Sequence, residues 1–168
     1  GIKPVIGCEM YVAQQGHQNK SDTNKYNHLV LLCRDQEGYR NLIQLVSTGF
    51  LDGFYYKPRV DKDLLARHSK GLTCLSACLR GDVNEAITSD RYEEAKRIAY
   101  EYQDMFGKGN FFLEIQDHDL DLDKKVIPGV SRLASDTGIP LVVTNDAHYL
   151  ENSSAHAHEI MLCIQTGK

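Results

Sequence analysis

The residues best suited to do chemistry lie near the carboxyl end, where Asp146 and His148 follow an apolar run over 139–144. That run is rich in β-branched residues, so it predicts a strand that ends at the pair. Alternate residues of an extended chain point to the same side, and the carboxylate and the imidazole could therefore reach one ion together. Oxygen and nitrogen ligands suit zinc, manganese or iron. The pair predicts a divalent metal site if other segments supply further ligands.

Two further candidates, Glu9 and His28, lie in strands expected at 5–12 and 27–33. A buried carboxylate without a partner is unfavourable, so Glu9 should face a cation, a base or water. A solvated strand face and a hydrogen-bonded histidine are the ordinary interpretations of the two residues taken singly. If the strands form a hairpin centred near 18–19, however, Glu9 and His28 lie roughly opposite each other, and each could supply one arm of a site.

Cys78 follows another expected strand and could add a thiolate, although taken alone it would be interpreted as structural. The chain has five cysteines, an odd number, without a pair of zinc-finger motifs. Most lie within apolar strands, which is typical of a protein of the reducing cytosol and not of a disulfide framework. We therefore expect a cytoplasmic protein.

An aromatic and basic segment offers a second kind of chemistry. Tyr55, Tyr56, Lys57 and Arg59 combine stacking surfaces with cations that pair with phosphate, which is what contact with single-stranded nucleic acid requires. An ordinary loop packed by its tyrosines explains the pattern equally well. Arg80, two residues after the candidate thiolate, is placed to neutralise a phosphate.

The elements that must position these residues alternate between strands and helices, which predicts an α/β fold. A polar stretch over 14–26 lacks helical periodicity and is expected to be a long hairpin loop. Strands are expected at 5–12, 27–33, 71–76, 111–116 and 139–144. Helices are expected after the N-caps Asp35 and Asp61, from a capping box of Asp90 and Glu93 to Gly107, over 123–137, and from Ser153 or Ser154 to 165.

Length and net charge limit the number of domains and the kinds of partner that the chain can have. A chain of 168 residues is long enough for one domain with a core. Its net charge of −4 gives no overall attraction to nucleic acid, so any such contact must come from a local patch. No apolar run is long enough to predict a membrane span, and no membrane partner is expected.

Several sequence strings that reach beyond these candidates resemble a single family. Together they resemble the PHP (polymerase and histidinol phosphatase) domain of bacterial replicative DNA polymerase III alpha subunits, over essentially the whole chain and in the same order. The strings lie at residues 2–9, 28–32, 37–42, 55–61, 75–79, 144–150 and 162–168.

The resemblance implies a distorted (β/α)7 barrel with a trinuclear metal centre at one mouth. In the family the ligands come from a His-x-His and an Asp-His motif, then from Glu, His, Cys and Asp-x-His. The later ligands match Glu9, His28, Cys78, Asp146 and His148. The two early motifs do not precede Glu9, so the resemblance implies a partial barrel that lacks its first strands. We expect residues 1–168 to form one domain of a larger polymerase chain. Its metal site should be incomplete, and it should show little activity by itself.

The function implied for the intact domain is metal-dependent 3′–5′ exonuclease proofreading within a DNA-directed DNA polymerase, with Asp146 and His148 as catalytic residues. The expected partners are single-stranded DNA ends and the remaining domains of the polymerase chain. The alternative is a catalytically silent module that docks a separate proofreading exonuclease subunit. A small-molecule phosphatase agrees less well with the strings outside the site.

Overall fold

The computed structural model describes residues 1–167, so Lys168, the last residue of the matching string at 162–168, lies outside the described part. The strands are β1 (Gly7–Ala13), β2 (Tyr26–Cys33), β3 (Arg59–Val60), β4 (Leu72–Leu75), β5 (Phe111–Ile115) and β6 (Leu141–Val143). The helices are α1 (Gln36–Leu51), α2 (Lys62–Arg67), α3 (Asp82–Thr88), α4 (Tyr92–Phe106), α5 (Asp123–Thr137) and α6 (Ala155–Thr166), with a short 3-10 turn, η1, at Asn152–Ser154. The α/β class is confirmed, and the five expected strands each lie within two residues of an observed strand.

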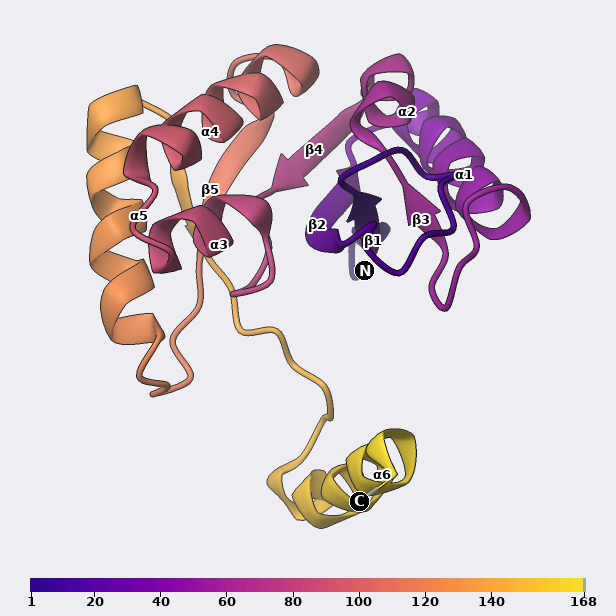
Figure 1. Cartoon of the computed structure of the whole chain (residues 1–168), viewed down its shortest axis with the longest axis vertical. Helices are drawn as coiled ribbons and strands as arrows, with labels where there is room; N and C mark the ends of the chain where they lie inside the picture. The colour runs from indigo at the N-terminus through magenta and orange to yellow at the C-terminus, as the bar shows by residue number, and fades with distance from the viewer. Residues whose placement is uncertain (168) are drawn as a thin grey trace.

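The strands form one mixed sheet in the order β3-β1-β2-β4-β5-β6. β1 with β3, β4 with β5, and β5 with β6 are parallel, whereas β2 is antiparallel to both of its neighbours. The sheet is open, with β3 and β6 at its edges, so the described residues do not form a closed barrel. Figure 1 shows α1 and α2 beside one end of the sheet, and α3, α4 and α5 beside the other end.

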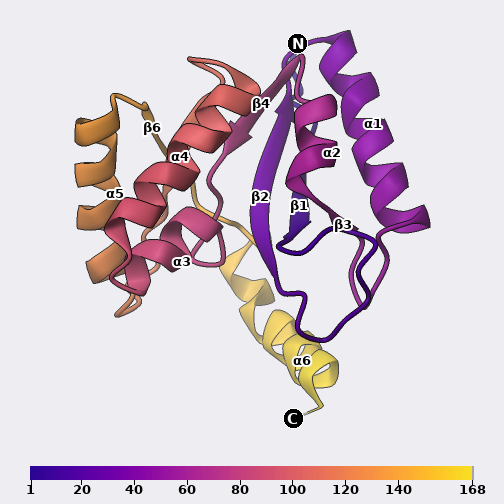
Figure 2. The same ribbon diagram turned by 45° about the horizontal axis from the view of Figure 1, so that its top comes forward.

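The core lies between the sheet and these helices. Leu29 and Leu31 of β2 are fully buried, while the alternate residues His28 and Val30 are only partly covered. This two-residue period shows that one face of the sheet packs on the core and the other face is more open. Figure 2 gives a second view of α1 and α2 beside β1–β3 and of α3–α5 beside β4–β6.

Local capping chemistry explains where several helices begin. The carboxylates of Asp35 and Asp61 accept hydrogen bonds from the amides of Gly38 and Leu64, each at 2.9 Å, which confirms both predicted N-caps. The capping box of Asp90 and Glu93 was a wrong prediction. Asp90 has a positive φ of 59°, and α4 begins after Arg91 without a side-chain cap. The reason is α3, which was not predicted and whose carboxyl-terminal turn uses Asp90.

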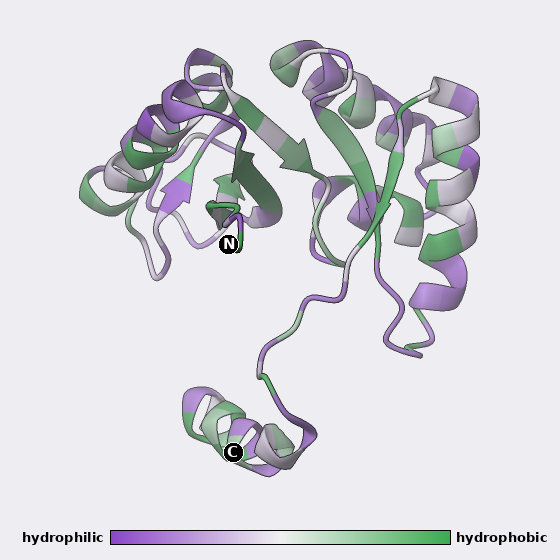
Figure 3. Cartoon of the chain, turned by 180° about the vertical axis from the view of Figure 1, so that it is seen from behind, coloured by the Kyte–Doolittle hydropathy of each residue, from purple (hydrophilic) through white to green (hydrophobic). Residues whose placement is uncertain are grey.

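The carboxyl-terminal helix α6 lies apart from the rest of the chain, at the end of an extended segment that follows β6 (Figure 1). It buries no residue, although apolar side chains are frequent along it, as the green bands of Figure 3 show. Its exposed large apolar residues are Ile160, Met161, Leu162 and Ile164. Among residues 1–167, no helix is both long enough and apolar enough to cross a bilayer.

Candidate metal centre

The β1–β2 hairpin brings Glu9 and His28 together, although not in the predicted register. Glu9 pairs with Val30, and Tyr11 pairs with His28, so the two candidates are diagonal neighbours and not directly opposite. The turn is centred one residue later than predicted, which moves each partner by two positions. Because side chains alternate with a period of two, a shift of two keeps both on one face. The Glu9 Oε1 atom lies 3.1 Å from the Nδ1 atom of His28.

A tight turn after β4 delivers Cys78 to the same histidine. The Cys78 Sγ atom lies 3.6 Å from His28 Nδ1. The turn requires unusual backbone at Ala77, whose φ is 63°, and a small residue at Gly81, where an added Cβ would lie 2.0 Å from the Ser76 carbonyl oxygen. The amide of His28 donates to the carbonyl of Arg80 at 3.0 Å, so the turn is held against β2.

We call Glu9, His28 and Cys78 the sheet trio. Contacts within this trio shift the pKa values of His28 and Glu9. Hydrogen bonds with Cys78 and with Glu9 raise the pKa of His28 to about 9, against the opposing effect of burial. The hydrogen bond with His28 lowers the pKa of Glu9, and nearby His148 and Arg80 lower it further. A protonated His28 imidazole is therefore the favoured state near neutral pH.

Asp146 and His148 are placed less firmly. Asp146 is partly buried and His148 is exposed. The strand predicted over 139–144 is only three residues long, and Asp146 has a positive φ of 43°. Strand alternation therefore does not extend to this pair, and His148 Nδ1 instead lies 2.8 Å from the Asp146 carbonyl oxygen. The link between His148 and the sheet trio is the favourable charge that lowers the pKa of Glu9.

The donor types fit a divalent metal, but the arrangement is incomplete. A carboxylate, an imidazole and a thiol in mutual proximity are the oxygen, nitrogen and sulfur ligands that zinc prefers. Within the described range, however, no set of three or more His, Cys, Asp or Glu side chains is arranged to hold an ion. The fold thus brings three of the five candidates into contact and leaves Asp146 and His148 outside that contact.

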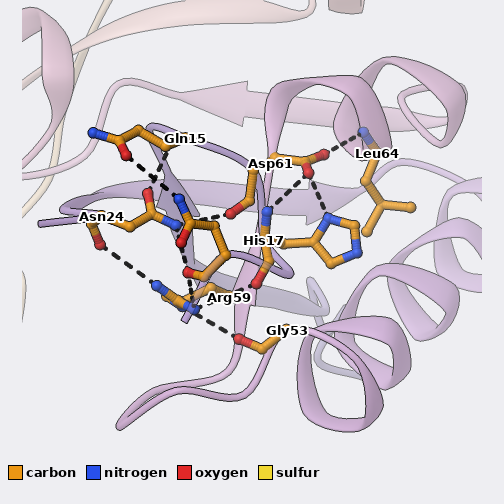
Figure 4. Close-up of polar contacts among 9 residues, drawn as sticks. Gln15, His17, Asn24, Gly53, Arg59, Asp61 and Leu64 are labelled. Carbon is orange, nitrogen blue, oxygen red and sulfur yellow. Dashed lines mark hydrogen bonds and ion pairs between the residues drawn. The ribbon is translucent and has the colours of Figure 1, made fainter. Parts of the chain in front are cut away.

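Arg59, one of the predicted nucleic-acid contacts, has a structural role instead. It is only 1% exposed, and its guanidinium donates to the carbonyls of Gly53, Asn24, His17 and Asn19 at 3.0–3.4 Å. Figure 4 shows Arg59 among the loop residues that it holds. The expectation that this charge faces phosphate is corrected, because its guanidinium is buried and donates to carbonyls of the β1–β2 loop and of the segment that follows α1.

The other predicted nucleic-acid residues remain accessible. Tyr56 is exposed, and its ring packs edge-on against Tyr55 with centroids 4.6 Å apart. Tyr55, Tyr56 and Arg80 line a cavity of about 530 Å³ together with Tyr26 of β2. Lys57 lies 5.6 Å from the centroid of the Tyr11 ring.

Two tyrosines that the sequence reasoning missed connect this cavity to the sheet trio. The rings of Tyr26 and His28 are stacked, with centroids 6.4 Å apart, and Tyr11 packs edge-on against both. Arg80 lies 5.8 Å from the centroid of the Tyr26 ring. The signal was present in the sequence, since Tyr11 and Tyr26 stand two positions from Glu9 and His28 and so share their face.

Comparisons with known proteins show which sequences the chain resembles. The family model described as "PHP domain" matches residues 1–118, which include the sheet trio but not Asp146 or His148. The chain is 48% identical to the DNA polymerase III subunit alpha of Treponema pallidum (strain Nichols), with 100% of the chain and 15% of that protein covered. The corresponding subunits of Helicobacter pylori (strain J99) and Thermus aquaticus are each 41% identical, with 100% and 99% of the chain covered but only 15% and 14% of those proteins.

The chain thus spans about 15% of the length of the curated relatives that it matches. The family match, by contrast, extends over more than half of the chain. It also includes the hairpin and the β4 turn that gather the carboxylate, imidazole and thiol. This chain therefore belongs to the PHP domain family.

Proposed function

We propose that residues 1–168 are one PHP domain fragment of the alpha subunit of a bacterial replicative DNA polymerase, and that the intact domain hydrolyses phosphodiester bonds at DNA 3′ ends with divalent metal ions. The observation that carries the proposal is the contact of His28 with both Glu9, on the same face of the sheet, and Cys78, in the turn after β4. The similarity of the whole chain to DNA polymerase III alpha subunits supports the polymerase context.

In this proposal the fold is a partial barrel of PHP type. The open edges at β3 and β6 expose unpaired backbone groups, which other strands of the intact domain would pair. Closing the sheet would also curve its open face around the sheet trio and bring it nearer to the segment that carries Asp146 and His148. We therefore expect residues 1–168 alone to have little activity.

Each residue would bind the metal ions through the donor atom that its side chain offers. Glu9 and Asp146 would hold zinc, manganese or iron ions through oxygen, His28 and His148 through nitrogen, and Cys78 through its thiolate. When bound, such ions lower the pKa of water and stabilise charge on a phosphate. His28 must release its proton to act as a ligand, so metal binding displaces the proton that its raised pKa favours.

The path of the DNA is proposed from the aromatic and basic side chains next to the trio. Single-stranded nucleic acid stacks its bases on aromatic rings and pairs its phosphates with cations. Tyr26, Tyr55 and Tyr56 supply rings around the 530 Å³ cavity, and Arg80 supplies a cation between that cavity and the trio. Lys57 supplies a second cation beside Tyr11.

Replacing His148→Ala in the intact protein tests the hydrolase. We expect the release of nucleotides from single-stranded DNA 3′ ends to be lost, and the incorporation of nucleotides to be unchanged. His156→Ala on α6, another exposed histidine, is the matched control and should leave both activities as they are. Unchanged exonuclease activity in the His148→Ala protein would remove the catalytic claim.

One observation favours the alternative, a catalytically silent module that docks a proofreading exonuclease subunit. Within residues 1–167, no three candidate ligands are arranged to hold an ion. The alternative predicts that the intact wild-type protein retains no zinc, manganese or iron after purification, and that a separate exonuclease co-purifies with it. Elemental analysis of the intact protein together with a DNA digestion assay distinguishes the two functions.

A further inference from the structure

A buried carboxylate on β5 has no part in the function proposed above. Glu114 is 3% exposed. Its Oε1 atom accepts a hydrogen bond from the Thr144 hydroxyl and another, at 3.2 Å, from the side-chain Nε2 of Gln116. Its other oxygen, Oε2, is buried and has no hydrogen-bond partner within the described part of the chain. A buried carboxylate is unfavourable unless it is paired, so this side chain should be kept for a purpose other than packing.

The strand register places Glu114 on the face that carries the sheet trio. Glu9 pairs with Val30, Val30 pairs with Leu75, and Leu75 pairs with Phe112, which makes one row across four strands. Residues paired in this way share a face, and so do residues two positions apart. Glu114 is two positions beyond Phe112, so its side chain belongs to the same face as that of Glu9.

Glu114 also connects the two segments that deliver the remaining candidate ligands. Its backbone amide donates to the Ser76 hydroxyl at 2.8 Å, and Ser76 stands two residues before Cys78. Its carboxylate holds the Thr144 hydroxyl, and Thr144 stands two residues before Asp146. One residue of β5 is thus bonded to both the segment before Cys78 and the segment before Asp146.

We propose that Glu114 is the positioning residue of Asp146 and His148. β6 is only three residues long, and its backbone pairing continues through the Thr144 amide to the Ile115 carbonyl, so the ladder offers little restraint to the residues after 144. A hydrogen bond to a charged group contributes more than a neutral one, and the Thr144 hydroxyl donates such a bond to the carboxylate of Glu114. In a loaded site, the negative charge of Glu114 on the same face would also favour cations. This second role rests on the proposed function, whereas the positioning role does not.

The test compares Thr144→Val with Thr144→Ser in the intact, metal-free protein. Valine keeps the size and the strand preference but loses the hydroxyl, and serine keeps the hydroxyl. The readout is the hydrogen-exchange protection of the residue 144 amide, which donates to the Ile115 carbonyl at 3.1 Å. We expect protection to fall about tenfold in Thr144→Val and to stay at the wild-type level in Thr144→Ser. The amides of β2 serve as the internal reference for the integrity of the fold.

A second readout is the affinity of the same proteins for Zn²⁺ or Mn²⁺ alone, measured by calorimetry. Partners that orient metal ligands change affinity by about 10- to 100-fold, so we expect at least a tenfold loss in Thr144→Val and recovery in Thr144→Ser. Glu114→Gln keeps an oxygen for Thr144 but removes the charge. It should therefore lower the protection of the residue 144 amide less than Thr144→Val does, because a neutral acceptor remains, and it should also lower metal affinity.

The outcomes separate this proposal from the proposed function. Protection in Thr144→Val equal to that of the wild type would overturn the positioning role, even if metal binds. A loosened segment with undiminished affinity for Zn²⁺ and Mn²⁺ would support the positioning of the segment but overturn any part of that positioning in metal binding. If the wild type binds neither ion, the metal function fails, and the exchange comparison between Val and Ser still decides whether Glu114 positions this segment.

Discussion

The β1–β2 hairpin and the segment that follows β6 both carry candidate ligands, but they are held in different ways. The hairpin pairs seven residues of β1 with β2, and its alternate residues, such as Leu29 and Leu31, are completely buried. After β6, by contrast, α6 has no buried residue, and Leu150 is fully exposed. Candidate ligands on the hairpin are therefore positioned by the core, whereas Asp146 and His148 are positioned by a few polar contacts.

This difference shows what the sheet provides to a site. A paired strand sets the direction of every side chain, so a ligand there costs no further ordering when the site is used. A ligand on a connecting segment must be ordered by contacts made for that purpose. These contacts include the hydrogen bonds of the Thr144 hydroxyl with Glu114 and with Gln116, and that of His118 Nε2 with the Asn145 carbonyl oxygen at 3.0 Å. Four substitutions would sharpen or break this contrast.

Arg59→Ala should have the largest effect, because it removes the cation that holds the loop of the hairpin. Four backbone carbonyl groups would lose the guanidinium as a donor at once, and we expect the free energy of unfolding to fall by roughly 3 kcal/mol. Hydrogen exchange of the β1 and β2 amides in the intact protein, followed with increasing urea, measures this loss. The exposed Arg67→Ala is the matched control. Equal stability of the two variants would show that the loop needs no buried cation.

The Cys78→Ser variant tests whether the sheet trio binds a metal ion through the Cys78 sulfur. Serine retains the shape but is a much poorer zinc ligand, so zinc affinity should fall at least about tenfold. Calorimetric titration of the intact protein with Zn²⁺ gives this number. Cys8→Ser is the matched control, because Cys8 precedes Glu9 in the chain and is not part of the sheet trio. This variant also replaces a thiol by a hydroxyl, and it should bind zinc as tightly as the wild type does. Indistinguishable affinities of the two variants would contradict the role of Cys78.

Asp61→Asn should reveal a pH-dependent part of the hairpin's stability. Burial acts to raise the pKa of Asp61, but hydrogen bonds from His17 and from the Leu64 amide outweigh it and lower the pKa below the ordinary value of 3.8. A lowered pKa stabilises the fold above the ordinary value, and this stability is lost as the pH falls through the folded-state value. We expect Asp61→Asn to destabilise the fold by about 1 kcal/mol at pH 7, because its hydrogen bonds from His17 lose a charged acceptor while the N-cap is kept.

The stability difference between the wild type and Asp61→Asn should shrink towards zero near pH 3, because the Asp61 carboxylate of the wild type is then increasingly protonated. Hydrogen exchange at these two pH values, corrected for the intrinsic rates, measures both numbers. Asp63→Asn, an exposed residue of the same helix, provides the control. A difference that persists unchanged at the lower pH would exclude the charge of Asp61 as the cause. Figure 4 shows His17 and Leu64 around this carboxylate.

Ile164→Ser on α6 should have the smallest effect. Ile164 is exposed, and no residue of α6 is buried, so the substitution removes no core contact within the described structure. We expect the stability of the sheet to change by less than about 0.5 kcal/mol. Exchange of the β1 and β2 amides in the intact protein provides the measurement. A loss as large as that of Arg59→Ala would show that α6 is coupled to the sheet after all.

Local chemistry determined much of what could be predicted from the sequence. Asp35 and Asp61 cap helices because their carboxylates accept amides of the following turn. Gly107 and Gly138 end helices with positive φ angles that glycine adopts without strain. The alternation of residues in β1 and β2 was enough to place Glu9 and His28 on one face, because that period survives a shift of two in register.

What only the tertiary structure decided depends on residues that are far apart in the chain. The burial of Arg59 results from carbonyls contributed by a loop some 35 to 42 positions earlier. Glu114 has its role through Ser76 and Thr144, which lie 38 and 30 positions away. A sequence pattern reports local preference, whereas packing and buried hydrogen bonds are set by which segments meet, so these contacts appear only once the chain is folded.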